Sequence, residues 1–549
     1  MRKAQSFLGD MVLTPTDNMH SEKMQPSVCR TGSAWVEPIR ALNAETVQCS
    51  AVENLCARVY PSPVCFFPLQ PDEDAYQHFR HMRQALSRVL FEIPVLSGII
   101  RVDNRGANSV EIPEAPRAGT RLHFRDLSQD AEFPTYAQLA QTGFPFADGE
   151  GDGLKELRPD PFPAAQDGDP VVVPQFNLLK GGIAVYCAYS HLVGDLVVGR
   201  DIILRWAANT RAIAEAAAVA KPAPPIESQF GPDLMDRSRL YPMNTDVLSI
   251  EQLQRRGNKL RTFKPLDPAD VAGTMAELQN LMPKAHISPA AVHEEDRLRE
   301  TTVGVWHFSM KQLKGIQAMA QKSAPSGARL TTMDAFTAFL WQRFFCAKYG
   351  GRDASGSIPE ESTCCFAGDV RRRLDPPLPQ NYLPAAVDIF KADLGSKELL
   401  PSDEASGLGK AATVLRQVND NWNREEYLTL IELVHRSPQL PCFIPRGPMD
   451  LLITDHSRAA SIMSTSWGPG LGKPAAFREP YLGRLIPAGE MTILPRWENG
   501  DIEVMIAGET VTLERLSSDA MMNKASKRQY IKHDVLQAAK DADVVKAKL

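Results

Sequence analysis

The sequence lacks an apolar run long enough to cross a membrane. Its apolar stretches, such as residues 193–204, are far shorter than the roughly 20 residues that a spanning helix needs, and Asp195, Arg200 and Asp201 interrupt this one. No apolar segment of the kind found in secretory signals follows the first residues. We therefore expect no membrane span and no secretion.

The sequence also lacks an excess of positive charge. It has 61 lysine and arginine residues against 66 aspartate and glutamate residues, a formal net charge of −5 at pH 7. Nucleic acids and anionic lipid surfaces are held chiefly by basic fields. The charge balance therefore argues against both of these partner classes.

Paired cysteine motifs are missing as well. The nine cysteines are scattered and odd in number, with no C-x-x-C pair, and Cys364 and Cys365 are adjacent rather than spaced as in a metal knuckle. We expect reduced thiols in an intracellular protein and no metal site.

The length and the pattern of the chain indicate two α/β domains. A chain of 549 residues is too long for one hydrophobic core, and short strand-like runs alternate with helical stretches, as in α/β proteins. A proline-rich stretch at residues 221–225 marks a change of character. The expected division is a first domain at 1–220, a linker or crossover segment at 221–300, and a second domain with a C-terminal helical tail at 301–549.

Hydrophobic periodicity predicts the main elements. Strands are expected at residues 59–69, at 171–189 as two strands around a turn at 180–182, and at 301–308. Helices are expected at 76–90, 201–217 and 334–349, the last with Thr331 or Thr332 as its N-cap. Residues 491–495 and 501–507 are expected to form a hairpin through Glu498-Asn499-Gly500.

One short pattern carries chemistry, namely His191-Leu192-Val193-Gly194-Asp195. It directly follows a predicted strand, so His191 is expected at a strand end where its side chain can face a cleft. A free imidazole, with a pKa of about 6.5, is mostly neutral at pH 7 and can take a proton from a hydroxyl or amine that attacks a thioester. The spacing alone leaves two interpretations open: a histidine base with an aspartate that pairs with a cation, or two structural residues.

Further segments resemble, in order, the BAHD-type acyltransferases, especially the fungal branch that includes trichothecene acetyltransferases. In the first half, residues 13–17 resemble the opening L-S-x-x-D, residues 86–98 the segment L-S-x-x-L…P-L-A-G, and Gln175-Phe176 with Gly181-Gly182 the strand pair before the histidine. In the second half, residues 332–341 resemble T-x-D-A-L-x-A-x-L-W, residues 369–379 resemble D-x-R-x-R-x-x-P-P-L-P, and residues 466–474 resemble D-F-G-W-G-K-P. The matches run from about residue 13 to 480.

The resemblance implies a fold and an activity. The fold would be that of chloramphenicol acetyltransferase: two similar domains, each a mixed sheet flanked by helices, with a channel at their interface. The protein would be a monomer without a permanently bound cofactor. It would use an acyl-CoA, with acetyl-CoA as the expected donor, to acylate a hydroxyl, or less readily an amine, of a small molecule in fungal secondary metabolism.

The resemblance also implies roles for single residues. His191 would be the general base, and Asp195 would pair with Arg371, unless Arg371 is a surface cation in the basic run 371–373. Thr454 is the candidate hydrogen-bond donor to the oxyanion. His456, two residues after Thr454, either lines the pocket or is exposed. The candidate residues on the CoA side are Gly468, Gly470, Gly472 and Lys473.

Three departures from the family pattern leave alternatives open. Leu196 follows Asp195 where glycine is usual, Ser466 replaces the aspartate of D-F-G-W-G, and Leu383-Pro384 replace Gly-Asn. A condensation-like domain of a peptide synthetase is less favoured, because Ser190 precedes His191 where such domains have a second histidine. A non-acylating descendant, which uses His191 for elimination or cyclisation or only binds a ligand, remains the alternative function.

The last three residues, Ala547-Lys548-Leu549, resemble the peroxisomal tripeptide Ser-Lys-Leu. The expected location is therefore the cytoplasm or the peroxisome.

Overall fold

The computed structural model describes residues 30–145, 156–163, 165–226, 230–240, 248–265, 301–349, 358–401, 403–441, 443–446, 449–479 and 488–531. The resemblance at residues 13–17, the end of the crossover segment and the terminal tripeptide lie outside these ranges. No helix in the described ranges has both the length and the apolar character needed to span a bilayer.

The first half of the chain builds a six-stranded mixed sheet in the order β1-β6-β7-β8-β3-β15. Only β6 and β7 run parallel, and the other neighbours are antiparallel. The strands are β1 (Arg30–Val36), β3 (Val64–Pro68), β6 (Thr120–Asp126), β7 (Val172–Leu179), β8 (Gly182–Tyr189) and β15 (Ala476–Arg478). A small sheet beside it consists of β2 (Glu45–Gln48), β4 (Ile99–Val102) and β5 (Asn108–Ile112).

The second half builds a seven-stranded mixed sheet in the order β12-β11-β14-β16-β17-β10-β18. Strand β14 runs parallel to both of its neighbours. The strands are β10 (Thr301–Phe308), β11 (Glu361–Asp369), β12 (Val387–Gly395), β14 (Leu451–Asp455), β16 (Glu490–Ile493), β17 (Ile502–Glu509) and β18 (Lys527–Ile531). The short strands β9 (Phe263–Pro265) and β13 (Phe443–Pro445) pair separately.

Helices flank both sheets. In the first half they are α2 (Ala51–Leu55), α3 (Ala75–Glu92), α4 (Tyr136–Gln141) and α5 (Leu196–Ala218), followed in the crossover segment by α6 (Ile250–Gly257). In the second half they are α9 (Met310–Ser323), α10 (Thr332–Tyr349), α11 (Ser396–Leu399), α12 (Glu404–Asp420), α13 (Arg424–Arg436), α14 (Ser461–Ser464), α15 (Thr510–Ser518) and α16 (Ala520–Ala525). The predicted α/β class with two mixed sheets is therefore confirmed.

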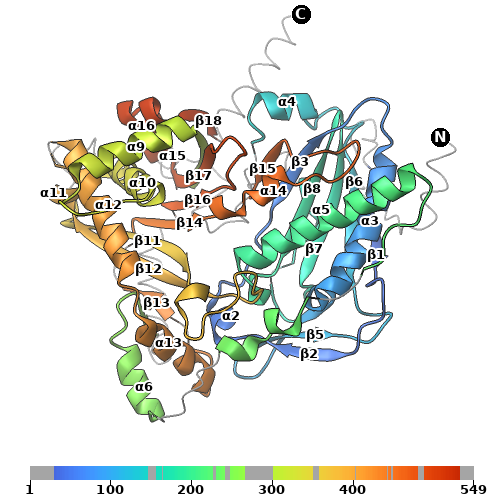
Figure 1. The fold of residues 1–549 in the computed structure, drawn as a ribbon, viewed down its shortest axis with the longest axis horizontal. Coiled ribbons are helices and arrows are strands. Elements are labelled where there is room, and N and C mark those ends of the chain that lie inside the picture. Colours follow the sequence, from blue (N-terminus) through green and yellow to red (C-terminus); the bar gives the residue numbers. More distant parts are fainter. Residues whose placement is uncertain are drawn as a thin grey trace, which may run out of the picture.

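The two halves are joined by a strand that crosses between them. Figure 1 shows the first half at the right and the second half at the left, with β15 from the second half lying among the strands of the first. Strand β15 pairs with β3 in an antiparallel register in which Phe477 lies opposite Cys65. The second half therefore contributes an edge strand to the first sheet, a feature that the expected boundary at residue 301 does not capture.

The second sheet packs on both faces, because successive side chains of a strand point to opposite sides. On β10, Trp306 belongs to the apolar cluster under α9, α10 and α12, whereas Val303 and Val305 join the core of the first half. On β17, Ile506 belongs to the same apolar cluster as Trp306, whereas Met505 joins the core of the first half. This second face forms the boundary between the two halves.

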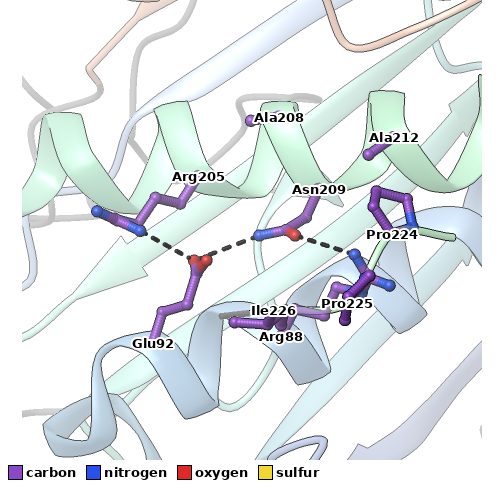
Figure 2. Close-up of a pocket in the computed structure, with 9 residues that line it drawn as sticks. All are labelled: Arg88, Glu92, Arg205, Ala208, Asn209, Ala212, Pro224, Pro225 and Ile226. Atoms are coloured by element: carbon purple, nitrogen blue, oxygen red, sulfur yellow. Dashed lines mark hydrogen bonds and ion pairs between the residues drawn. The ribbon is translucent and has the colours of Figure 1, made fainter. Parts of the chain in front are cut away.

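Helices α3 and α5 lie against each other on the first sheet and are linked by polar side chains (Figure 2). Glu92 on α3 forms an ion pair with Arg205 on α5 at 3.3 Å and accepts a hydrogen bond from Asn209 at 3.3 Å. Pro224 and Pro225 of the crossover segment close one side of a hollow of about 310 Å³ at this seam. The start of the crossover segment thus packs on the first half.

The structure confirms most of the predicted elements and corrects two statements. The strand pair at 171–189, the strand at 301–308 and the hairpin at 491–507 are present, and Thr331 caps α10 by accepting a hydrogen bond from the Asp334 amide. The predicted helical tail is wrong at Lys527–Ile531, which forms β18 because it pairs with β10. The crossover segment is also more than a linker. Its helix α6 packs on α13, and its strand β9 pairs with β13, both in the second half.

Candidate active site

The loop that carries His191 follows the central hairpin of the first sheet. Strands β7 and β8 are buried along their whole length, and the chain leaves β8 at Tyr189 into a short 3-10 turn, His191–Val193. The amide of Ser190 donates to the Val171 carbonyl at 2.8 Å, and the amide of His191 donates to the Val59 carbonyl at 2.9 Å. These bonds place His191 at a strand end, where the sheet fixes its backbone.

The imidazole of His191 has two unlike nitrogens. Its Nδ1 atom is buried and has no hydrogen-bond partner among the described residues, whereas the residue as a whole is partly exposed. Nε2 is therefore the nitrogen that we consider for contact with an approaching molecule.

Asp195 ends the motif and begins α5. Its Oδ1 atom accepts the amide of Val197 at 2.9 Å, which makes it the N-cap of the helix. Its Oδ2 atom accepts the amide of Ala386, which directly precedes β12 in the second half, at 3.0 Å. The Asp195 side chain is therefore buried and ties the first half to the second.

Arg371 meets Asp195 across the boundary between the halves. Its Nη2 atom lies 2.9 Å from Oδ2 of Asp195 and also donates to the Pro384 carbonyl at 2.9 Å. Its Nε atom donates to the Tyr382 carbonyl at 3.0 Å, and Nη1 lies 3.2 Å from Asp369. Burial alone would lower the pKa of Arg371, but Asp195 and then Asp369 raise it above the ordinary value. With a side chain only 1% exposed, Arg371 is not a surface cation.

The turn between His191 and Asp195 leaves no space for a side chain at Gly194. A Cβ atom there would lie 2.6 Å from Cγ1 of Val198 and 2.7 Å from the Leu383 carbonyl oxygen. Leu383 and Pro384 depart from the family pattern, and the Leu383 carbonyl packs closely on Gly194 while the Pro384 carbonyl accepts from Arg371. Leu196, another departure, is the first residue of α5.

Thr454 lies on β14 beside Thr492 of the parallel strand β16. Its neighbour Ile453 is buried under the helices of the second half. Because side chains alternate along a strand, Thr454 faces the other side of the sheet, towards the first half. It is partly exposed there.

His456 follows β14 and lies against a carboxylate at the boundary. Its Nδ1 lies 2.7 Å from Oε2 of Glu479, which follows β15, although the angle between the groups is not that of a hydrogen bond. Burial favours a lower pKa for His456, but the charge of Glu479, then those of Asp455 and Asp195, raise it above the ordinary value. Burial, followed by the charge of Glu479, also raises the pKa of Glu490 to about 7. With a side chain 12% exposed, His456 is mostly covered at the boundary and is not an exposed side chain.

The glycine-rich loop closes on itself over the first half. The amide of Trp467 donates to the Gly472 carbonyl at 2.7 Å, and the Gly472 amide to the Gly468 carbonyl at 2.9 Å. The Trp467 ring packs on Phe67 and Trp206. Ser466, in place of an aspartate, accepts the Gly468 amide through its hydroxyl at 3.2 Å, and so still anchors the loop.

Lys473 at the end of this loop is half exposed. Its ammonium group lies 2.5 Å from a carboxylate oxygen of Glu498, which is also exposed. The predicted contact of Lys473 and Gly468, Gly470 and Gly472 with CoA stays a prediction.

Two family profiles match this chain. The trichothecene 3-O-acetyltransferase-like N-terminal domain matches residues 59–210, and the Transferase family matches residues 162–522, which is more than half of the chain. The chain belongs to the Transferase family. It is thus a BAHD-type acyltransferase, as the resemblance of its motifs predicted.

Fungal relatives match over nearly their whole length. The chain is 24% identical over 500 residues to acyltransferase clz6 of Cochliobolus lunatus, covering 89% of this chain and 96% of that protein. It is 26% identical over 494 residues to acyltransferase easC of Emericella nidulans, and the match covers 87% of this chain and 94% of that protein.

A solved structure shows the same fold. The crystal structure of F. graminearum TRI101 complexed with coenzyme A and T-2 mycotoxin has a TM-score of 0.67 at 18% identity, covering 89% of this chain and 100% of that one. The expected chloramphenicol acetyltransferase-like fold is confirmed by this likeness.

The structure brings some of the predicted residues together and adds others. The Asp195 carboxylate meets the Arg371 guanidinium, whereas the loop at 468–472 contacts the outer helices α3 and α5 near Glu73 and Arg211. Sequence reasoning missed Glu479 and also Arg237, whose Nη2 atom donates to the Val193 carbonyl at 3.3 Å. No motif contains these two residues, so no local signal could have identified them.

Proposed function

We propose that this protein transfers an acyl group, with acetyl as the expected group, from coenzyme A to a hydroxyl of a small-molecule natural product. The placement of His191 supports this proposal most strongly, because the residue is partly exposed while backbone bonds and the Asp195–Arg371 pair hold its loop. Membership of the Transferase family supplies the acyl-transfer class. The TRI101 complex, which contains coenzyme A and a mycotoxin, supports the two substrate classes.

The reaction begins with His191 as the general base. Its Nε2 takes the proton from the acceptor hydroxyl while the hydroxyl oxygen forms a bond to the thioester carbonyl carbon. The carbonyl electrons move to oxygen and give a tetrahedral oxyanion. When the carbon–sulfur bond breaks, the sulfur leaves with its electron pair and receives the proton from the imidazolium. The products are the acyl ester and free CoA.

Thr454 is the proposed donor to the oxyanion. Its hydroxyl is on the face of the second sheet that looks towards the first half, the side on which His191 is held. A hydrogen bond to the oxyanion strengthens as charge develops and so lowers the barrier of the step.

Asp195 is proposed to act only on the geometry of the loop. Both of its carboxylate oxygens are bound by Val197, Ala386 and Arg371, so we propose that Asp195 takes no part in proton transfer. Because the two halves that meet at the boundary belong to one chain, we propose that a monomer is active.

The departures at Leu196 and Ser466 do not favour a non-acylating function. Leu196 occupies the first helical position of α5, and the Ser466 hydroxyl anchors the glycine loop through Gly468. Neither residue alters the bonds that hold His191, so acyl transfer is the reaction that we propose.

The proposal is tested with purified protein, acetyl-CoA and a panel of polyketide and terpenoid alcohols. We expect release of free CoA thiol that depends on the acceptor, and a product heavier by one acetyl group in mass spectrometry. Longer acyl-CoAs tested in parallel identify the preferred donor. Tight binding of an alcohol without CoA release from any donor would contradict the proposal.

A further inference from the structure

The loop of His191 is held on a second side, away from Arg371. Arg237 lies in the crossover segment, in a short 3-10 turn at Arg237–Leu240. Its Nη2 atom donates to the Val193 carbonyl at 3.3 Å, and its side chain is only 9% exposed. A residue from the connection between the halves thus bonds directly to the backbone two positions after His191.

The counterion of Arg237 is Glu53 on α2. Nε of Arg237 donates to Oε2 of Glu53 at 2.9 Å, and the Glu53 side chain is completely buried. The same Oε2 accepts the Ser50 amide at 2.7 Å, while Oε1 is buried without a hydrogen-bond partner among the described residues. A buried carboxylate in this setting depends on its cation, so Glu53 fixes Arg237 as firmly as Arg237 stabilises Glu53.

The neighbouring carbonyl of the loop is held from the same side. The thiol of Cys49, which immediately precedes the Ser50 cap of α2, donates to the Leu192 carbonyl at 3.3 Å. Burial, and then the charge of Glu53, raise the pKa of Cys49, so the thiol keeps its proton and remains a donor. Two consecutive carbonyls of the loop are therefore bonded to side chains. The Leu192 carbonyl accepts from Cys49, and the Val193 carbonyl accepts from Arg237.

We propose that Arg237, held by Glu53, is a positioning residue that sets the orientation of the His191 imidazole. This inference rests on the proposed role of His191 as the base. The Arg371–Asp195 pair fixes the end of the motif at residue 195, and Arg237 fixes its middle at residue 193. With residues 193 and 195 both bonded, the backbone after His191 keeps one conformation. The imidazole then keeps its alignment with the acceptor. A displacement of about 1 Å in such a group slows catalysis by as much as about 10²-fold.

An arginine is required at this position because one planar group serves two acceptors. The guanidinium donates to Glu53 from Nε and to Val193 from Nη2. A lysine ammonium keeps the charge opposite Glu53 but lacks the planar fork that reaches both groups at once. Arg237→Lys therefore removes the anchor on the loop while retaining the buried charge pair.

The experiment compares Arg237→Lys with wild type in full-length protein, using the acceptor found for the wild-type enzyme. We expect kcat per folded molecule to fall about 10- to 100-fold while KM for acyl-CoA stays within about 2-fold. In Arg237→Ala, added guanidinium ion should restore part of kcat, because it can occupy the vacated space between Glu53 and Val193. A residue that only stabilises the fold would produce neither the split between kcat and KM nor the rescue.

Arg343→Lys is the matched control. Arg343 on α10 is also buried, with a side chain 2% exposed, and its Nη1 lies 3.3 Å from Asp519 and 3.4 Å from Glu404 in the helical layer of the second half. This variant should lose stability and keep kcat per folded molecule.

Wild-type kcat in Arg237→Lys, or no rescue of Arg237→Ala by guanidinium, would overturn the positioning role. His191→Ala, assayed alongside, separates this failure from that of the proposed function. A fully active His191→Ala refutes the base itself, whatever Arg237 does.

Discussion

Two of the buried arginine–carboxylate pairs lie at the boundary between the halves of this protein, and they differ in which further groups they bind. Asp195 and Arg371 have side chains 5% and 1% exposed, and Arg478 and Glu503 have side chains 2% and 8% exposed. The contacts between opposite charges are also alike, at 2.9 Å and 2.8 Å. By burial and charge alone the two pairs are equivalent.

The remaining hydrogen bonds separate them. Asp195 caps α5 directly after the His191 turn and accepts an amide from the second half. Arg478 on β15 donates instead to the carbonyls of Phe144 and Phe477, and its partner Glu503 lies on β17, so this pair fastens the crossing strand. Burial of a charge pair therefore does not by itself indicate a role in chemistry. In the function that we propose, the backbone segment that the pair holds determines whether it has one.

The sharpest test of this difference is Asp195→Asn. The change removes the buried counterion of Arg371 and leaves only the partly exposed Asp369, so we expect a loss of about 3 kcal/mol in the free energy of unfolding. Because the turn after His191 loosens as well, kcat per folded molecule should also fall by about 10²-fold or more. Denaturant unfolding and CoA release measure the two effects. Lost activity at full stability would contradict the role of Asp195 as a structural support.

Arg478→Met is the counterpart on the other pair. It leaves Glu503 buried and unpaired, so we expect a comparable loss of stability of about 3–5 kcal/mol. The kcat of the molecules that remain folded should stay within about 3-fold of wild type, because Arg478 binds the carbonyls of Gly143, Phe144 and Phe477 and the Glu503 carboxylate, which lie outside the His191 turn. A fall in kcat as large as that of Asp195→Asn would erase the distinction between the pairs.

Replacing both partners sharpens the comparison further. In Arg478→Met with Glu503→Leu no buried charge is left alone, and such replacements are often neutral or stabilising. We expect the double variant to regain most of the stability that Arg478→Met loses, as measured by denaturant unfolding. No recovery would show that the hydrogen bonds of Arg478 to carbonyls, rather than its charge, hold the crossing strand.

The smallest effect is expected at Glu490, a carboxyl near the boundary whose pKa is raised to about 7 by burial and then by Glu479. The folded protein binds this proton more tightly than the unfolded chain does. The contribution of Glu490 to stability is therefore complete below about pH 4.5 and lost as the pH rises through about 7. Glu490→Gln, which cannot ionise, should gain about 1–2 kcal/mol over wild type at pH 8 and little at pH 4.5. Thermal unfolding of both proteins at the two pH values measures this gain, and an equal difference at both would contradict it.

The sequence predicted the parts of this fold that local patterns determine. The β7–β8 hairpin follows from an apolar run on each side of Gly181-Gly182, and α10 follows from helical spacing after the Thr331 cap. Strand β18 was missed because its residues are charged and alternate poorly, and only pairing with β10 makes it a strand. Local composition cannot supply such a tertiary cause.

The same limit applies to the site. The family resemblance pointed to Asp195 and Arg371, which belong to recognisable motifs far apart in the chain. Arg237 and Glu53 are 184 positions apart and belong to no motif, and their contact exists only because the crossover segment folds against α2. Residues that align a catalytic group through its backbone leave no pattern in one sequence.

The central claim is that His191 is the base of acyl transfer, and its most direct test is the rate of acceptor-dependent CoA release by His191→Ala. We predict a fall of about 10²- to 10⁴-fold in kcat with an unchanged melting temperature and an unchanged KM for acyl-CoA. A variant that is folded and releases CoA at the wild-type rate would contradict the account.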